Sequence, residues 1–181
     1  PTPRPSALVR GRLEAVPQRT GAAPIVEGKM VLWAAHEQDG ALIWGIEPET
    51  FGTVSDLPEH LYLATDKQIN FDPEGGRLPG IVLGTQLANR LRIGIGQEVY
   101  LLTFPSSDVE EVALLGLKPK VHPFVVTDLF QSGMYHYDDN FGFISLAAAQ
   151  DVLNLGDAVT DIHLRVTDLD EATEIGERLS G

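Results

Sequence analysis

The sequence contains no cysteine, which excludes disulfide bonds, thiolate metal sites and cysteine nucleophiles together. It also lacks an apolar run approaching the length of a membrane-spanning helix (about 18 residues), and its first residues contain no apolar segment typical of a signal peptide. What its 181 residues do contain is a 43% share of hydrophobic side chains and an ordinary 22% share of charged ones. This composition predicts a folded chain with one domain or two small lobes.

Basic residues are scarce. Lysine and arginine total 13, against 26 aspartates and glutamates, so the formal net charge at neutral pH is −13. Such an acidic surface repels nucleic-acid phosphates and anionic lipid head groups, which argues against nucleic acid as a partner. The same charge keeps a domain soluble and could attract a basic partner, and the composition does not separate these two roles.

Hydrophobic periodicity and turn residues predict an α+β chain with more strand than helix. Asp39-Gly40 is typical of a tight hairpin turn, and the proline-rich stretch 48–79 is expected to be a surface connection with a lobe boundary near Pro79. Strands are expected at residues 22–35, 41–46, 80–84, 98–102, 121–130, 141–144 and 159–166. Helices are expected at residues 7–15, 57–63, 85–91 and 145–153, with a last one that Asp168 caps.

Gly94-Ile95-Gly96 resembles part of a phosphate-binding loop. A dinucleotide fingerprint needs a preceding strand, a following helix and a third glycine three residues further on. Here a helix is expected before the glycines and a strand after them, and Val99 takes the place of the third glycine. The segment therefore predicts a turn, and the sequence predicts no cofactor site.

Histidine and aspartate gather at His136, Asp138 and Asp139, a mixture that could hold a metal in a small hydrolase. His122 and His163 lie on separate predicted elements, and none of the three histidines has the i, i+4 spacing of a helical ligand pair. No Gly-x-Ser-x-Gly nucleophile elbow occurs. We therefore expect no metal and no catalysis, and keep a metal-dependent hydrolase as the alternative from another functional class.

Segment 104–120 lies between two predicted strands and is longer than an ordinary hairpin connection. Prolines bracket it, and apolar residues gather inside it. Such residues on a protruding loop indicate a partner surface, whereas a short strand folded back onto the core would explain them equally well. The candidate partner-binding residues are Pro105, Val109, Val112, Leu114, Leu115, Leu117 and Pro119.

Several segments follow one another in a fixed order: GIVLGTQLA at residues 80–88, SGMYHYD at 132–138, FISL at 143–146 and the closing stretch 159–172. Together they resemble LolC/LolE-type lipoprotein-releasing ABC transporter permeases, within the wider MacB-like permease group. Their order and spacing together are specific, and the match covers residues 80–175. Asp128 and Asp161 stand where glycine is usual in the family, and His136 stands where glutamate is common.

The resemblance implies the extracytoplasmic domain of a multi-pass permease, cut from between its first and second transmembrane helices on the periplasmic side of the bacterial inner membrane. It implies a two-lobed MacB-like fold. Residues 1–79 and 157–181 would form a Porter-type α/β lobe, and residues 80–156 an inserted, strand-rich Sabre-type lobe. It also implies a separate cytoplasmic ATPase subunit and a second permease copy or paralogue as partners.

The function that the resemblance implies is release of lipoproteins from the inner membrane and their hand-over to a periplasmic carrier, with no enzymatic activity in this domain. In the family, a loop of the inserted lobe hooks the carrier. Residues 105–119 occupy the corresponding stretch, which favours exposure of that loop. The alternative within the same class is a MacB-like permease that exports peptides or small molecules.

Overall fold

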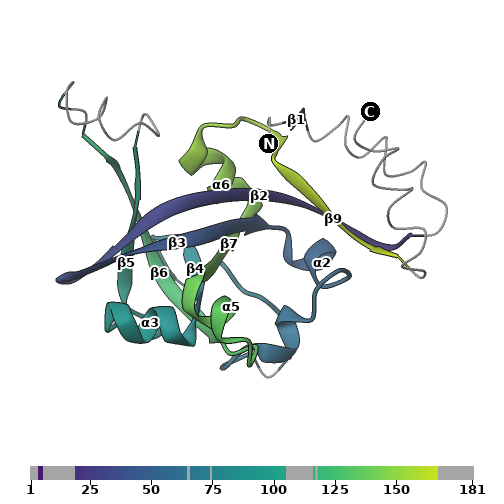
Figure 1. The fold of residues 1–181 in the computed structure, drawn as a ribbon, viewed down its shortest axis with the longest axis horizontal. Helices are drawn as coiled ribbons and strands as arrows, with labels where there is room; N and C mark the ends of the chain where they lie inside the picture. The colour runs from purple at the N-terminus through teal and green to yellow at the C-terminus, as the bar shows by residue number, and fades with distance from the viewer. Residues whose placement is uncertain are drawn as a thin grey trace.

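The computed structural model describes residues 4–5, 19–64, 66–73, 75–104, 116 and 118–166 (Figure 1). These residues form a mixed α+β structure in which one sheet dominates, which confirms the prediction of a chain richer in strand than in helix. The helices expected at 7–15 and after Asp168 lie outside the described residues. No helix among the described residues is long and apolar enough to cross a bilayer.

The elements predicted between residues 80 and 166 are confirmed, with one interruption and one addition. The strands are β1 (Arg4–Pro5), β2 (Arg19–Ala34), β3 (Glu37–Ile46), β4 (Gly80–Gly84), β5 (Glu98–Thr103), β6 (Lys120–Phe130), β7 (Phe141–Ser145), β8 (Ala158–Val159) and β9 (Asp161–Val166). The helices are α2 (Pro48–Phe51), the 3-10 turn η1 (Leu57–His60), α3 (Thr85–Leu91), α5 (Tyr135–Asn140) and α6 (Leu146–Leu153). The strand predicted at 159–166 divides at Thr160, whose N–H donates to the Ile25 carbonyl and whose hydroxyl accepts from the Glu27 N–H. The sequence pattern does not predict α5, because its six residues lack an apolar stripe.

Six strands close into a barrel. β2 pairs with β3 along one edge and with β5 on the other, and β7, β4 and β6 complete the ring in the order β3-β7-β4-β6-β5. The β3–β7 and β4–β6 pairs are parallel, and the remaining pairs of the ring are antiparallel. β9 extends the sheet beyond the ring by pairing with the first part of β2. The 16 residues of β2 make both contacts possible, because β9 and β5 use different stretches of the same edge.

The hairpin turn between β2 and β3 lies earlier than predicted. Ala34 pairs with Glu37, so Ala35 and His36 form the turn, and Asp39-Gly40 lies inside β3 opposite Leu32 and Val31. The prediction of a turn at Asp39-Gly40 is therefore wrong. A turn there would leave only residues 41–46 to pair with β2, whereas the observed register pairs all 10 residues of β3. The longer ladder outweighs the local preference of Asp-Gly for a turn.

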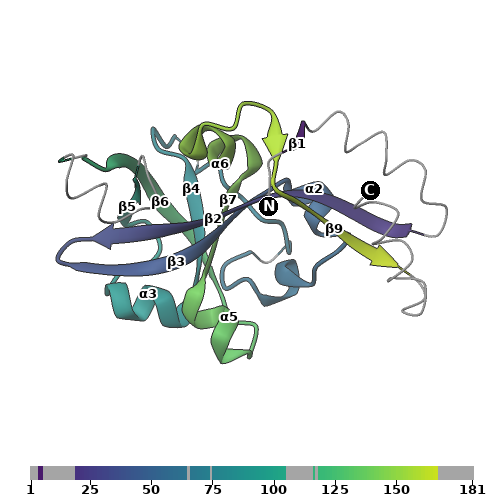
Figure 2. The same ribbon diagram turned by 45° about the horizontal axis from the view of Figure 1, so that its top comes forward.

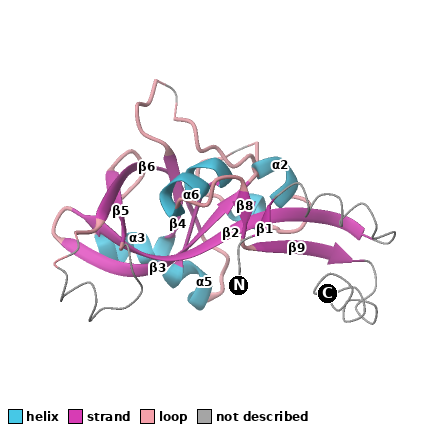
Figure 3. Cartoon of the chain, turned by 90° about the horizontal axis from the view of Figure 1, so that it is seen from above, coloured by secondary structure: helices cyan, strands magenta, loops and turns pink. Residues whose placement is uncertain are grey.

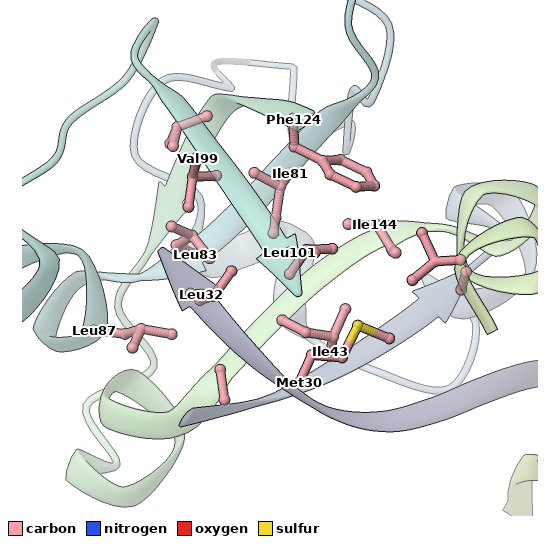
Figure 4. Close-up of a cluster of buried hydrophobic side chains, with 14 of the residues drawn as sticks. Met30, Leu32, Ile43, Ile81, Leu83, Leu87, Val99, Leu101, Phe124 and Ile144 are labelled. Carbon is pink, nitrogen blue, oxygen red and sulfur yellow. The ribbon is translucent and has the colours of Figure 1, made fainter. Parts of the chain in front are cut away.

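Apolar side chains fill the inside of the barrel. Figure 4 shows Leu32, Ile43, Ile81, Leu101 and Phe124 converging from five different strands, and each is at most 1% exposed. The period-2 alternation of each strand brings these residues to the inner face. Burial of this apolar surface is the main stabilising contribution to the fold.

A second apolar cluster packs against the outside of the ring. Phe51 of α2, Phe71, Phe130 and Phe143 belong to it and are almost fully buried. The Phe130 and Phe143 ring centroids lie 5.3 Å apart. This cluster attaches the connection 48–79 to the sheet. The connection is therefore partly buried, whereas the sequence predicts only a surface connection.

Helices cover opposite sides of the barrel. Figures 1 and 2 show α6 on one side of the β2–β3 hairpin and α3 and α5 on the other. As predicted, Ser145 caps α6 by accepting a hydrogen bond from the Ala148 N–H (3.2 Å), and Asn154 ends the helix in the left-handed conformation.

The expected division into a lobe from residues 1–79 and 157–181 and a lobe from residues 80–156 stays a prediction. β2 and β3 come from the first set of residues and β4 to β7 from the second, and all six belong to one seven-stranded sheet.

Candidate partner-binding surface

The β5–β6 hairpin carries the loop in which the sequence predicts partner binding. The two strands are antiparallel and pair from Glu98 opposite Val125 to Thr103 opposite Lys120. Among the predicted residues, Pro119 is described and lies half-buried just before β6. The other six lie outside the described residues, so their role stays a prediction: Pro105, Val109, Val112, Leu114, Leu115 and Leu117.

Thr103 and His122 tie the two strands together at the base of the loop. Thr103 Oγ1 lies 3.1 Å from His122 Nε2. Burial lowers the pKa of His122, Lys120 lowers it further, and Asp151 acts in the opposite direction. The ring is therefore neutral at neutral pH, and the link is a hydrogen bond between uncharged groups.

The outward side of the same strands is apolar across three neighbouring strands. Val31 of β2 lies opposite Leu102 of β5, which in turn lies opposite Val121 of β6. In the next row Trp33 lies opposite Tyr100, and their ring centroids are 5.7 Å apart. We call this surface the stem face, and define it by Val31, Trp33, Tyr100, Leu102, Phe104, Val121 and Pro123.

The stem face exposes large apolar side chains beside the loop. Trp33 is 43% exposed, Phe104 46% and Val121 49%. The Tyr100 hydroxyl donates to Glu98 Oε2 (3.0 Å), and this contact raises the pKa of Tyr100. Adjoining exposed apolar and aromatic side chains on a rigid ladder are typical of protein interaction sites. The surface can therefore bind an apolar partner, and it offers no nucleophile or acid–base pair for chemistry.

Sequence reasoning misses most of the stem face. Alternation around Trp33 indicates that its side chain points out of the sheet, but nothing local to β2 indicates that Tyr100 and Val121 lie beside it. The pairing of β2 with β5 brings these residues together, and that pairing is a tertiary contact.

The residues that a metal-dependent hydrolase would use, His136, Asp138 and Asp139, take part in structural contacts. The Asp138 carboxylate is buried and accepts hydrogen bonds from the Ser132 N–H (2.7 Å), the Ser132 hydroxyl (2.8 Å) and the Gly133 N–H (3.2 Å). Asp139 forms an ion pair with Arg90, and the amide of Asn140 donates to the His136 carbonyl (3.0 Å). In the part of the chain that the structure describes, no group of three histidine, aspartate or glutamate side chains could hold a metal ion.

His163 of β9 lies in an aromatic setting and not in a polar site. Its ring centroid is 4.9 Å from that of Trp44, in an edge-to-face arrangement, and it also contacts the Phe51 ring. Burial lowers the pKa of His163, while Asp161 and Glu27 act in the opposite direction. A half-buried neutral imidazole against aromatic rings is a packing residue.

The fold defines the class of protein to which the chain is similar. It superposes over 97% of its length on the extracellular domain of the noncanonical ABC-type transporter YknZ from Gram-positive bacteria, with a TM-score of 0.60, 10% identity and coverage of 80% of that chain. It superposes over 98% of its length on the periplasmic region of MacB from Actinobacillus actinomycetemcomitans, with a TM-score of 0.57, 11% identity and coverage of 72% of that chain. The predicted MacB-like fold is therefore confirmed.

Curated sequences similar to the chain are LolC proteins, although no protein-family model matches it. It is 27% identical over 167 residues to the lipoprotein-releasing system transmembrane protein LolC of Xylella fastidiosa (strain 9a5c), covering 91% of the chain and 37% of that protein. It is 25% identical over 150 residues to LolC of Neisseria meningitidis serogroup B, covering 81% of the chain and 33% of that protein. The chain thus spans little more than a third of the length of these relatives, and the resemblance to LolC-type permeases is confirmed.

Proposed function

We propose that the chain is the extracytoplasmic domain of an ABC transporter permease that helps to release lipoproteins from the inner membrane and to hand them to a periplasmic carrier. The observation that carries the proposal is the similarity to LolC over 91% of the chain. The fold shared with the YknZ and MacB regions supports a position outside the membrane in a permease. In this proposal the domain performs no chemistry, and ATP hydrolysis belongs to a separate cytoplasmic subunit that works with a second permease copy or paralogue.

The surface proposed to meet the carrier is the loop 105–119 together with the stem face. The loop supplies clustered leucines and valines, and Trp33, Phe104 and Val121 continue that apolar surface onto the sheet. Both ends of the loop are attached to strands of a closed barrel, so a rotation of the domain would move the base of the loop with it. The domain would thereby couple movement of the permease to the position of the carrier.

The loop is tested by replacing Leu114 and Leu115 together with aspartate. Binding to the purified periplasmic lipoprotein carrier is measured by isothermal titration calorimetry, with circular dichroism to verify folding. We expect Kd to rise about tenfold or more, because aspartates would desolvate at an apolar contact. The matched control replaces the exposed Met134 and Tyr135 with aspartate and should bind like the unmodified chain. Unchanged carrier binding by a folded Leu114→Asp, Leu115→Asp chain would remove the loop from the proposal.

The stem face is tested separately with Trp33→Gln. This substitution removes the aromatic surface without adding charge, and we expect carrier affinity to fall about fivefold to thirtyfold. If the Leu114→Asp, Leu115→Asp variant loses affinity for the carrier and Trp33→Gln does not, the contact is confined to the loop.

Carrier binding also separates lipoprotein release from the alternative of a MacB-like exporter. An exporter of peptides or small molecules has no need to bind a soluble lipoprotein carrier. If the unmodified chain shows no affinity for the carrier, while a full-length permease restores export of a peptide, lipoprotein release is the wrong function.

A further inference from the structure

A cavity of about 630 Å³ lies away from the stem face, between the α2–η1 segment and residues 67–72. Ser145, at the start of α6, closes one side of it. Figures 1 and 3 show α2 well apart from β5 and β6, towards the part of the molecule where β9 pairs with β2. The volume lies within the range of sites that bind drug-sized ligands.

The lining of this cavity is acidic. Glu49, Asp56, Glu59 and Asp72 line it, against a single basic residue, Lys67. Lys67 is already paired with Glu59, and Asp56 accepts from Arg165 Nη2 at 2.9 Å. Among the described residues, no hydrogen bond or ion pair reaches the carboxylates of Glu49 and Asp72. The side chains of Glu49 and Asp72, both exposed at the cavity, therefore have no ion-pair partner among the described residues.

The floor of the cavity is apolar and fixed. Ile69 and Phe71 line it and belong to the buried cluster outside the barrel, each being 6% exposed. The Phe71 carbonyl accepts a hydrogen bond from the Gly80 N–H of β4 (2.7 Å), which ties this wall to the sheet. On the opposite wall, the Gly52 N–H donates to the Pro48 carbonyl (3.1 Å). The Gly80 contact therefore ties the Phe71 wall to the sheet, whereas the Gly52 contact closes the end of α2.

We propose that this cavity binds an extended segment of polypeptide that carries lysine or arginine side chains. The aliphatic stem of such a side chain packs on Ile69 and Phe71, while its ammonium or guanidinium group pairs with Glu49 or Asp72. Charge complementarity excludes phosphates and other anions as occupants. A single divalent ion is a poorer match, because no three acidic or histidine side chains among the described residues converge closely enough to coordinate one.

This inference does not rest on the proposed function, since no residue of the stem face lines the cavity. A domain with a formal net charge of −13 attracts many basic molecules weakly, so the test must separate the cavity from the general field. The apolar floor makes this distinction possible, because a basic peptide can pack apolar side chains on Ile69 and Phe71 and a simple polyamine cannot.

The experiment titrates the acetylated and amidated tripeptide Lys-Leu-Lys into the isotope-labelled 181-residue chain at low ionic strength. Amide shifts are followed by nuclear magnetic resonance. We expect saturable binding with shifts centred on Gly52, Ile69 and Phe71. The double variant Glu49→Gln, Asp72→Asn should raise Kd about fivefold to tenfold, because it removes two charge pairs at exposed side chains. The control Glu98→Gln, Asp151→Asn removes the same charge at exposed positions outside the cavity lining and should leave Kd within about twofold.

Three outcomes would overturn the proposal. Shifts that spread over the surface without saturating would mean that the chain attracts cations only through its net charge. Equal weakening by the cavity variant and by its control would mean the same. If spermidine binds as tightly as the tripeptide at the same residues, Ile69 and Phe71 do not contribute to binding. A polypeptide would then not be the preferred occupant. None of these results bears on carrier binding, which is tested at the stem face and the loop 105–119.

Discussion

The guanidinium of Arg90 in α3 lies against Asp39 in β3, with 2.5 Å between Arg90 Nε and Asp39 Oδ2. The same guanidinium donates through Nη2 to the Asp139 carbonyl of α5 (2.8 Å) and pairs through Nη1 with the Asp139 carboxylate. One side chain thus joins a helix, a strand of the barrel and a second helix. It also gives Asp39 a partner inside β3, where the local sequence favours a turn.

Substitution of Arg90 by glutamine should destabilise the fold by about 1 to 2 kcal/mol, because it breaks three contacts of a partly exposed cation. The control is Arg92→Gln, since Arg92 is well exposed and meets Glu37 at 3.5 Å. That change should cost less than about 0.5 kcal/mol. Urea denaturation of the three proteins at one pH measures both effects, and equal midpoints for the two variants would contradict the role of Arg90.

Asp128 holds the segment after η1 onto β6. Its buried carboxylate accepts hydrogen bonds from the backbone N–H groups of Tyr62, Leu63, Ala64 and Leu129. Asp128→Asn places an amide among these donors, and we expect a loss of about 2 to 4 kcal/mol in the free energy of unfolding. Asp157→Asn at an exposed turn is the control and should change it by less than about 0.5 kcal/mol. Amide exchange would localise the loss: if residues 62–64 stay as protected as before, Asp128 does not anchor them.

Gly84 allows close packing of α5 at the end of β4. A Cβ atom at this position would lie 2.2 Å from the Asp138 carbonyl oxygen, whereas a Cβ at Gly40 in β3 would meet nothing within 4 Å. Gly84→Ala should therefore destabilise the chain by about 2 to 3 kcal/mol through overpacking. Gly40→Ala should be neutral or stabilise it by up to about 1 kcal/mol, since alanine lowers the entropy of the unfolded chain. Thermal unfolding of both variants gives the comparison, and a Tm for Gly84→Ala at or above that of Gly40→Ala would refute the packing argument.

His163 makes stability depend on pH. Burial lowers its pKa in the folded state below the usual value near 6.5, so the unfolded chain binds the proton more readily. Its contribution is complete above pH of about 6.5 and declines as pH falls from there through the folded-state value. His163→Gln removes this proton uptake. The free energy of unfolding should therefore decrease less between pH 7.5 and 5.5 than in the unmodified chain. Denaturant titrations at several pH values measure the slope, which His122 also shapes in the same direction. Identical slopes with and without His163 would show that its titration is not linked to folding.

Much of the second half of the chain could be predicted because its signals are local. Gly80–Gly84 is a short apolar run and forms a fully buried strand. Ser145 and Asn154 mark the two ends of α6 as predicted, since capping depends on side chains within a few residues of the helix end. The ordered motifs indicated the MacB-like fold for the same reason, because each motif is a short stretch that can be recognised in a single sequence.

Features that depend on distant pairing could not be obtained in this way. Asp39-Gly40 has the residues of a turn, yet the ten-residue ladder with β2 holds it in a strand. Asp128 stands where the resembled family usually has glycine. Only the tertiary structure shows that its carboxylate accepts hydrogen bonds from the backbone of residues 62–64.

Residue order in this chain therefore determines where most strands and helices begin and end, and it determines the acidic charge of the surface. Tertiary structure decides the closure of the barrel, the meeting of Trp33 with Tyr100 on the stem face, and the cavity that Glu49 and Asp72 share. The reason is physical: backbone preferences act within a few residues, whereas a surface or a cavity exists only once distant segments pair and bury their apolar sides.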